Sequence, residues 1–142
     1  DVAEPRVRFP GSGGANDVAS HARHLLIITK HEKRRFPERV DYISSPGYID
    51  GPNGRRKAGL PTPDQDITLI TDLCVMNIDK SVGRFRVTSL MPGVTLEQVL
   101  ENTMFEPLLE SELDIVEPPS DDYLRILRED VDPDQVYFKS DS

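Results

Sequence analysis

The sequence predicts an α/β fold: an open, mainly parallel sheet with flanking helices, a hairpin insertion and a C-terminal helix. Short apolar runs alternate with short helical patterns along most of the chain. The run at residues 24–29 is continuously apolar and β-branched, which is typical of a strand buried on both faces of a parallel sheet. Residues 84–90 instead alternate polar and apolar side chains, which indicates a strand with one solvated face.

Length and composition suit one intracellular domain. The 142 residues are enough for a core without disulfides, so we expect one domain over residues 1–142, with a loosely held tail at 132–142. Cys74 is the single cysteine and lies in an apolar run, which predicts a buried thiol in a reducing compartment. No apolar run reaches the roughly 20 residues of a membrane span. We therefore predict a cytoplasmic protein with no membrane partner.

Charge is distributed unevenly along the chain. Residues 106–142 hold 12 acidic and 3 basic residues, whereas the first 105 hold 13 acidic and 14 basic ones. A near-neutral body with an acidic end argues against nucleic acid as the main partner.

The first third of the chain is predicted to carry a strand, a glycine-rich turn and a helix in direct succession. Residues 7–10 form the predicted strand, and the glycines at 11–14 form the turn. Asn16 or Asp17 is the expected N-cap of a helix that runs to about residue 23. The next predicted elements are the strand at 24–29, a polar segment at 30–37, a strand at 40–43 and a turn at 45–48.

The rest of the chain is predicted from its loop-forming glycine and proline residues and from helix-capping residues. Residues 50–66 suggest a long exposed loop that could form a flap over a site. Thr95 and Gln98 form a capping box, with Val94 and Val99 placed for a hydrophobic staple. The other predicted elements are a strand at 67–78 that bends near Asp72, a hairpin connection at 79–83, the strand at 84–90, a helix to about 102, a short strand at 105–109, a stiff spacer at 117–119 and a helix at 121–130 capped by Ser120.

The glycine-rich turn is the first candidate site. Free backbone N–H groups at the start of a helix favour an anion or a developing oxyanion. The spacing fits neither a dinucleotide fingerprint nor a phosphate-binding loop. A tight turn without a ligand remains the alternative. The residues involved are Gly11, Ser12, Gly13, Gly14, Ala15 and Asn16.

A basic segment is the second candidate. It follows a predicted buried strand, and ligands of open α/β sheets bind beyond the carboxyl ends of strands. A phosphate-rich ligand could bind there, although a solvated face or an ion-paired subunit contact is the interpretation that charge alone favours. Arg55, Arg56 and Lys57 carry the same two interpretations. The segment's basic residues are Lys30, Lys33, Arg34, Arg35 and, just beyond, Arg39.

Metal and serine-nucleophile chemistry are not indicated. His21, His24 and His31 do not form a ligand set with the one cysteine, so we expect no metal site. Ser12 lies in no nucleophile-elbow pattern.

Six motifs along the chain form a familiar set. They are VRFPGSGGAND at 7–17, KHEKRRF at 30–36, VDYISSPGY at 40–48, ITDL at 70–73, PGVT at 92–95 and LRILREDVDP at 124–133. Taken together, they resemble the C-terminal half of the β subunit of a family I CoA-transferase, of the glutaconate or 3-oxoacid CoA-transferase type. The resemblance covers nearly the whole chain and implies that family's α/β fold.

The resemblance implies transfer of coenzyme A between carboxylic acids through a glutamyl anhydride and a glutamyl-CoA thioester. The turn at 11–14 would stabilise the oxyanion, and residues 30–35 would contact coenzyme A. No glutamate here matches the family's nucleophile motif. We therefore expect that glutamate on a missing N-terminal half or on an α subunit, with an acyl-CoA as substrate and no permanent cofactor. The same fold could instead act as a hydrolase or decarboxylase on a CoA thioester, or serve as a non-catalytic partner subunit.

Overall fold

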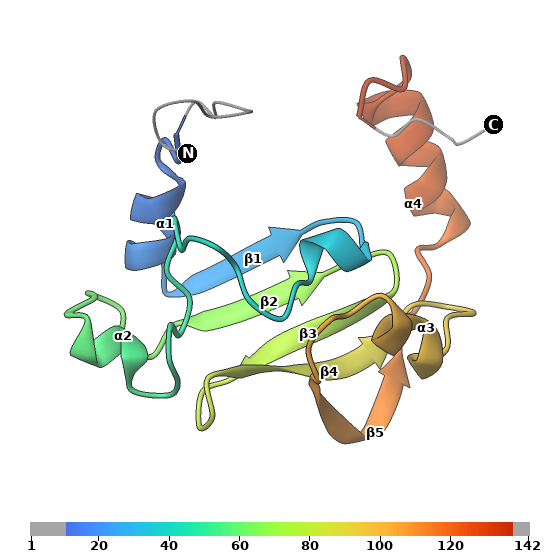
Figure 1. The fold of residues 1–142 in the computed structure, drawn as a ribbon. Coiled ribbons are helices and arrows are strands. Elements are labelled where there is room, and N and C mark those ends of the chain that lie inside the picture. Colours follow the sequence, from blue (N-terminus) through green and yellow to red (C-terminus); the bar gives the residue numbers. More distant parts are fainter. Residues whose placement is uncertain (1–10, 138–142) are drawn as a thin grey trace, which may run out of the picture.

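The described part of the chain forms one open, five-stranded mixed sheet. A computed structural model describes residues 11–137, and Figure 1 shows their arrangement. The spatial order of the strands follows the sequence, from β1 at one edge to β5 at the other. β1 pairs parallel with β2, and β4 pairs parallel with β5, whereas β3 is antiparallel to both of its neighbours. The strands are β1 (His24–Ile28), β2 (Asp66–Ile70), β3 (Cys74–Asp79), β4 (Arg84–Leu90) and β5 (Leu108–Ile115).

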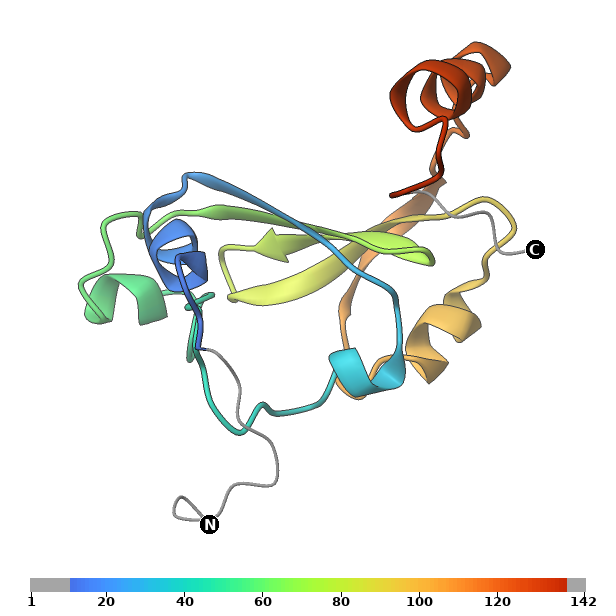
Figure 2. The same ribbon diagram turned by 90° about the horizontal axis from the view of Figure 1, so that it is seen from above.

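The predicted open α/β sheet with flanking helices is confirmed, and two of its four strand pairs are parallel. Figure 2 shows η1 and α3 on one side of the sheet and α4 on the other. The predicted hairpin connection at 79–83 joins β3 to β4. The helices are α1 (Ala15–His21), η1 (Lys33–Arg35), α2 (Gly54–Lys57), α3 (Leu96–Glu101) and α4 (Asp121–Ile126), which continues into η2 (Leu127–Val131).

The core lies on one face of the sheet, beneath β2, β3 and β4. Its centre is made of side chains with no exposed surface, including Met76 and Val87. Phe36 and Val99 cover these residues from the segment after β1 and from α3. Cys74 is fully buried in the same cluster, as the sequence predicted, and burial raises the pKa of its thiol.

Two of the predicted helix caps are confirmed. The Thr95 hydroxyl accepts the Gln98 amide, and the Gln98 side chain accepts the Thr95 amide in return, which completes the capping box of α3. The Ser120 hydroxyl accepts the Tyr123 amide at the start of α4. The prediction for α1 is wrong, because that helix begins at Ala15 with Gly14 as its N-cap.

Three predicted strands differ from those in the structure. Residues 67–78 form two antiparallel strands, with the predicted bend near Asp72 serving as their turn. The predicted strand at 40–43 is irregular and pairs with none of the five strands that the structure describes. The last strand begins at Leu108 rather than at 105, after Pro107, whose ring nitrogen has no N–H to donate to a sheet.

The strand β1 differs most from expectation. Its side chains were predicted to be buried on both faces, but Leu26 is 67% exposed and Ile28 is 79% exposed. The reason is the face that these side chains occupy. Leu26 and Ile28 alternate with Ile27, which lies in register with the core residue Leu69, so they point away from the core. β1 is also an edge strand, paired only with β2 in the part of the chain that the structure describes.

Candidate functional site

The glycine-rich turn leads directly into α1 and is open to solvent. The predicted strand at 7–10 lies outside the described residues. Gly11 and Gly13 have φ angles of +99° and +53°, in the left-handed region that favours glycine. A Cβ added at Gly11, Gly13 or Gly14 would meet no heavy atom within 4 Å. The turn therefore leaves the backbone approachable by a ligand.

The amides of this turn include donors that no described residue uses. The Ala15 amide donates to the Ser12 carbonyl at 3.1 Å, and the Asp17 amide donates to the Asn16 side chain at 3.0 Å. Within residues 11–137, no hydrogen bond engages the amides of Gly13 and Gly14. Two neighbouring, exposed N–H groups can donate to an anionic oxygen.

The helix α1 is fixed to the body at its C-terminal end. Ala19 is its one buried residue. The side-chain amide of Gln65 donates to the carbonyls of Ala19 and Ala22 at 2.9 and 2.7 Å. The Tyr48 hydroxyl in turn donates to the Gln65 carbonyl at 2.8 Å. These contacts hold the helix that carries the glycine-rich turn.

Arg55 also holds the C-terminal end of α1 in place. The prediction that Arg55 lies exposed in a loop is wrong. The guanidinium is fully buried and donates to the carbonyls of Ala19, Ser20 and Thr62. It also donates to the Thr62 hydroxyl at 2.8 Å and to the carbonyls of Pro46 and Gly47. Burial lowers the pKa of Arg55 from its ordinary value. A cation at the carbonyl end of α1 also complements the helix dipole.

The basic segment lies directly after β1, and most of its charges are paired. Glu32 accepts from Arg34 at 2.7 Å and from Arg35 at 3.2 Å, which lowers the pKa of the Glu32 carboxyl. Lys30 lies 3.7 Å from a carboxylate oxygen of Asp72. Lys33 is exposed and forms no ion pair with any described residue. The segment thus forms ion pairs within the chain, whereas charge alone favoured a solvated face or an ion-paired subunit contact.

The two predicted sites are not brought together in this chain. The glycine-rich turn precedes α1, which leads to the beginning of β1, whereas Lys30–Arg35 follow the end of β1 (Figure 1). A ligand that touched both would have to extend along β1.

A buried histidine joins the basic segment to the core, a role that the sequence did not predict for it. His31 is 5% exposed, and its ring nitrogens each lie 3.0 Å from a threonine hydroxyl, Nδ1 from Thr71 and Nε2 from Thr103. The ring stacks on Phe36 with centroids 4.2 Å apart. Because these threonines lie 40 and 72 residues further along the chain, no local spacing could have indicated the cluster.

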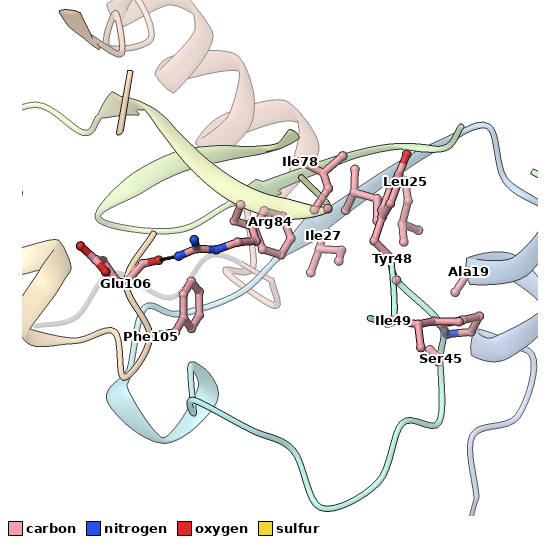
Figure 3. Close-up of a pocket in the computed structure, with 15 residues that line it drawn as sticks. Ala19, Leu25, Ile27, Ser45, Tyr48, Ile49, Ile78, Arg84, Phe105 and Glu106 are labelled. Carbon is pink, nitrogen blue, oxygen red and sulfur yellow. Dashed lines mark hydrogen bonds between the residues drawn. The ribbon is translucent and has the colours of Figure 1, made fainter. Parts of the chain in front are cut away.

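An apolar cavity of about 420 Å³ lies between the sheet and the loop that contains Tyr48. Figure 3 shows Leu25 and Ile27 of β1 and Ile78 of β3 in its lining, with Ala19 of α1 at one end. Burial raises the pKa of Tyr48. The opposite end is bounded by Phe105, Arg84 and Glu106, where the guanidinium donates to the Glu106 carbonyl. The lining suits an apolar group and brings no acid–base pair together.

Two further observations concern residues 11–137. Nowhere in them do three side chains of the histidine, cysteine, aspartate and glutamate types come close enough to hold a metal ion. None of the helices in this range combines the length and the apolar character needed to cross a membrane.

Comparison with known proteins gives the family. The coenzyme A transferase family model matches residues 1–102. The chain is 37% identical over 139 residues to the β subunit of glutaconate CoA-transferase from Acidaminococcus fermentans, covering 98% of this chain and 52% of that protein. The crystal structure of that enzyme superposes with a TM-score of 0.87 at 38% identity, over 99% of this chain and 53% of the matched chain.

Two other relatives carry different activities in their names. The chain is 45% identical over 103 residues to the β subunit of 3-oxoadipate CoA-transferase from Pseudomonas knackmussii, covering 72% of this chain and 39% of that protein. It is 33% identical over 130 residues to the cholesterol ring-cleaving hydrolase IpdB subunit of Rhodococcus jostii, covering 90% of this chain and 49% of that protein. The chain thus spans about half the length, or less, of these curated relatives. With the family model matching most of its length, the chain belongs to the coenzyme A transferase family.

Proposed function

We propose that this chain is the C-terminal part of a CoA-transferase β subunit, which moves coenzyme A from an acyl-CoA to a carboxylic acid. The observation that carries the proposal is the open glycine-rich turn, whose Gly13 and Gly14 amides are unused within the described residues. Membership of the family and the 37% identity to the glutaconate CoA-transferase β subunit support the choice of reaction.

In the proposed reaction, a glutamate carboxylate attacks the thioester carbonyl and displaces the CoA thiolate, leaving an acyl-glutamyl anhydride. The thiolate then attacks the glutamyl carbonyl, releasing the first carboxylate and forming a glutamyl-CoA thioester. The incoming carboxylate repeats these two steps in reverse order. Negative charge develops on a carbonyl oxygen at each attack, and the turn formed by Gly11, Ser12, Gly13, Gly14, Ala15 and Asn16 would stabilise it.

The basic segment would hold the phosphate end of coenzyme A. Lys33 is the best placed of its residues, since it is exposed and has no carboxylate partner among the described residues. Arg34 and Arg35 share Glu32, so a phosphate group could replace that carboxylate as their acceptor. The separation of this segment from the glycine-rich turn requires an extended ligand, and an acyl-CoA is one.

The nucleophilic glutamate would come from outside this chain, from the rest of the subunit or from an α subunit. The strand β1 supports a further neighbour outside residues 11–137. Within that range β1 pairs only with β2, and the exposed side chains of Leu26 and Ile28 are typical of a strand that is covered in a larger assembly. The relatives' additional length could supply both the covering strand and the glutamate.

The test is the replacement Gly13→Val in the assembled enzyme. Gly13 has open space around it, so a valine would block the turn without colliding with the protein, although the positive φ adds strain. We expect the rate of CoA exchange to fall by roughly 10²–10³, as for a damaged oxyanion hole. Gly59→Val is the matched control, because Gly59 has a φ of +69° and equally open space. Equal activity of the two variants would contradict the proposed role of the turn.

A hydrolase is the second candidate, favoured by the 33% identity to the IpdB subunit. The two activities differ in the acceptor, which is water in one case and a carboxylate in the other. Incubation of the assembly with an acyl-CoA alone would release free coenzyme A steadily only from a hydrolase. A non-catalytic subunit would bind the acyl-CoA without turnover, and Gly13→Val would leave that binding largely unchanged.

A further inference from the structure

We propose that His31 is a positioning residue, whose neutral imidazole holds residues 30–36 in place and releases them when it gains a proton. One of the readouts below, the affinity for coenzyme A, rests on the proposed function; the others do not. His31 joins three parts of the chain: the segment after β1, the turn between β2 and β3 through Thr71, and the end of α3 through Thr103.

The hydrogen-bond pattern assigns one tautomer to the ring. The Thr103 hydroxyl donates to the Val99 carbonyl at 2.8 Å, so it is available to the ring as an acceptor and receives a proton from Nε2. The Thr71 hydroxyl oxygen accepts the amides of Leu73 and Cys74 at 3.1 and 2.9 Å, which uses both of its lone pairs. Its own hydrogen is within reach of the Cys74 carbonyl at 3.0 Å and of Nδ1 at 3.0 Å. Nδ1 therefore has no acceptor in Thr71 and carries no hydrogen.

A second proton on the ring would disrupt this arrangement. It would sit on Nδ1 and point at a threonine oxygen that already accepts two N–H groups. It would also place a positive charge in a site that is 5% exposed. Burial lowers the pKa of His31 more than the nearby Asp72 carboxylate raises it.

The groups that face the ring are few. From the β2–β3 turn, Asp72 accepts the His31 backbone amide at 2.7 Å and pairs with Lys30. The Cys74 sulfur lies 3.7 Å from Nδ1, and burial keeps that thiol protonated by raising its pKa. Thr103 and Phe36, which face the ring from the other sides, do not titrate.

The ring controls the segment through its two fixed ends. His31 fixes one end, and Phe36 fixes the other by stacking on the ring and by accepting the Met104 amide at 2.8 Å. Between these ends lie Lys33, Arg34 and Arg35, in a single helical turn with little burial of its own. Loss of the His31 contacts would therefore free the three cations together.

The first experiment follows the ring and the amides by NMR in the purified protein. At about pH 7.5 we expect the Nε2–H tautomer, with the amides of Arg35, Phe36 and Met104 protected from exchange. Below the pKa of His31 these three amides should lose protection by about tenfold or more relative to the amides of β3 and β4. An Nδ1–H tautomer, or a protonated ring with unchanged protection, would overturn the proposal.

Variants separate this role from general destabilisation. Thr103→Val removes the acceptor of Nε2 and should lower protection of the three amides at about pH 7.5. Thr95→Val is the matched control on the same helix, since it damages the cap without touching His31. His31→Gln can still donate to Thr103 but does not titrate, so below the pKa of His31 it should protect the segment better than the native histidine does. Equal pH dependence in His31→Gln and the native protein would contradict the proposal.

Calorimetric titration with coenzyme A tests the link to function. We expect Thr103→Val to weaken the affinity about five- to tenfold relative to Thr95→Val, the effect of one lost hydrogen bond. If the native assembly binds no coenzyme A while the amide results hold, the proposed function fails and the role of His31 stands. If coenzyme A binds with equal affinity to both variants and their amides are equally protected, the role of His31 fails.

Discussion

The guanidinium of Arg55 donates to the carbonyl oxygen of Ser20 at 3.1 Å and so ties α2 to the last turn of α1. These residues are 35 positions apart in the sequence. Because the guanidinium faces carbonyls and the Thr62 hydroxyl rather than a carboxylate, several polar groups depend on one side chain. The glycine-rich turn at the other end of α1 is oriented by this contact.

We predict that Arg55→Met destabilises the protein by about 3 kcal/mol or more, because it leaves several buried carbonyls without donors. Lysine at this position should recover only part of the loss, since it has fewer donors and no planar fork. Urea unfolding measures both effects. Arg56→Met is the control, because Arg56 is exposed and pairs with Asp64 at 3.4 Å, a contact of little value. Similar losses of stability in Arg55→Met and Arg56→Met would refute the structural role assigned to Arg55.

Thr95→Ala should lower the free energy of unfolding by about 1 kcal/mol, the usual effect of a lost N-cap. The loss should be global, since α3 carries the fully buried Val99 into the core. Ser120→Ala removes the equivalent cap of α4, a helix with no buried residue, and should only increase local amide exchange there. Hydrogen exchange in both variants distinguishes the two responses, and global destabilisation by Ser120→Ala would contradict this reasoning.

Met76→Ala should destabilise the protein by about 2–5 kcal/mol, the range for large-to-small changes in a packed core. Met76 has no exposed surface and lies at the centre of the core cluster on β3. Met104 is half exposed, so Met104→Ala should cost far less. Thermal unfolding of the two variants gives the comparison, and a small effect at Met76 would argue against the described core.

Acid should weaken the contact between Asp79 and Arg86. Their 2.7 Å ion pair, with help from Ser81, lowers the pKa of Asp79 to about 2. A depressed carboxyl pKa stabilises the fold above the unfolded value of about 3.9, and the contribution is lost as pH falls toward the folded value. Asp79→Asn should therefore flatten the pH dependence of the urea midpoint between about pH 4 and pH 2. An unchanged slope would show that the pair contributes nothing to acid stability.

The candidate site was only partly predictable from the sequence. The glycine-rich turn and the basic segment could be located, because each is defined by residue types within a few positions. The pairing of Glu32 with Arg34 and Arg35 is also between neighbouring residues, but it was not predicted, because charge alone favoured a solvated face or a subunit contact. Arg55 and His31 could not be assigned, because their partners come from distant segments and the residue type alone permits several roles.

By itself, the sequence determined the local structure: the capping box at Thr95, the hairpin at 79–83 and the alternating strand at 84–90 are set by neighbouring residues. Long-range packing controls the features that neighbouring residues do not set. Within residues 11–137 it leaves 40–43 unpaired and places β1 at an edge of the sheet. It also buried Arg55 and enclosed His31 between two threonines. The physical reason is that burial and hydrogen-bond satisfaction depend on which segments meet, whereas capping and turn formation depend on the chain within a few residues.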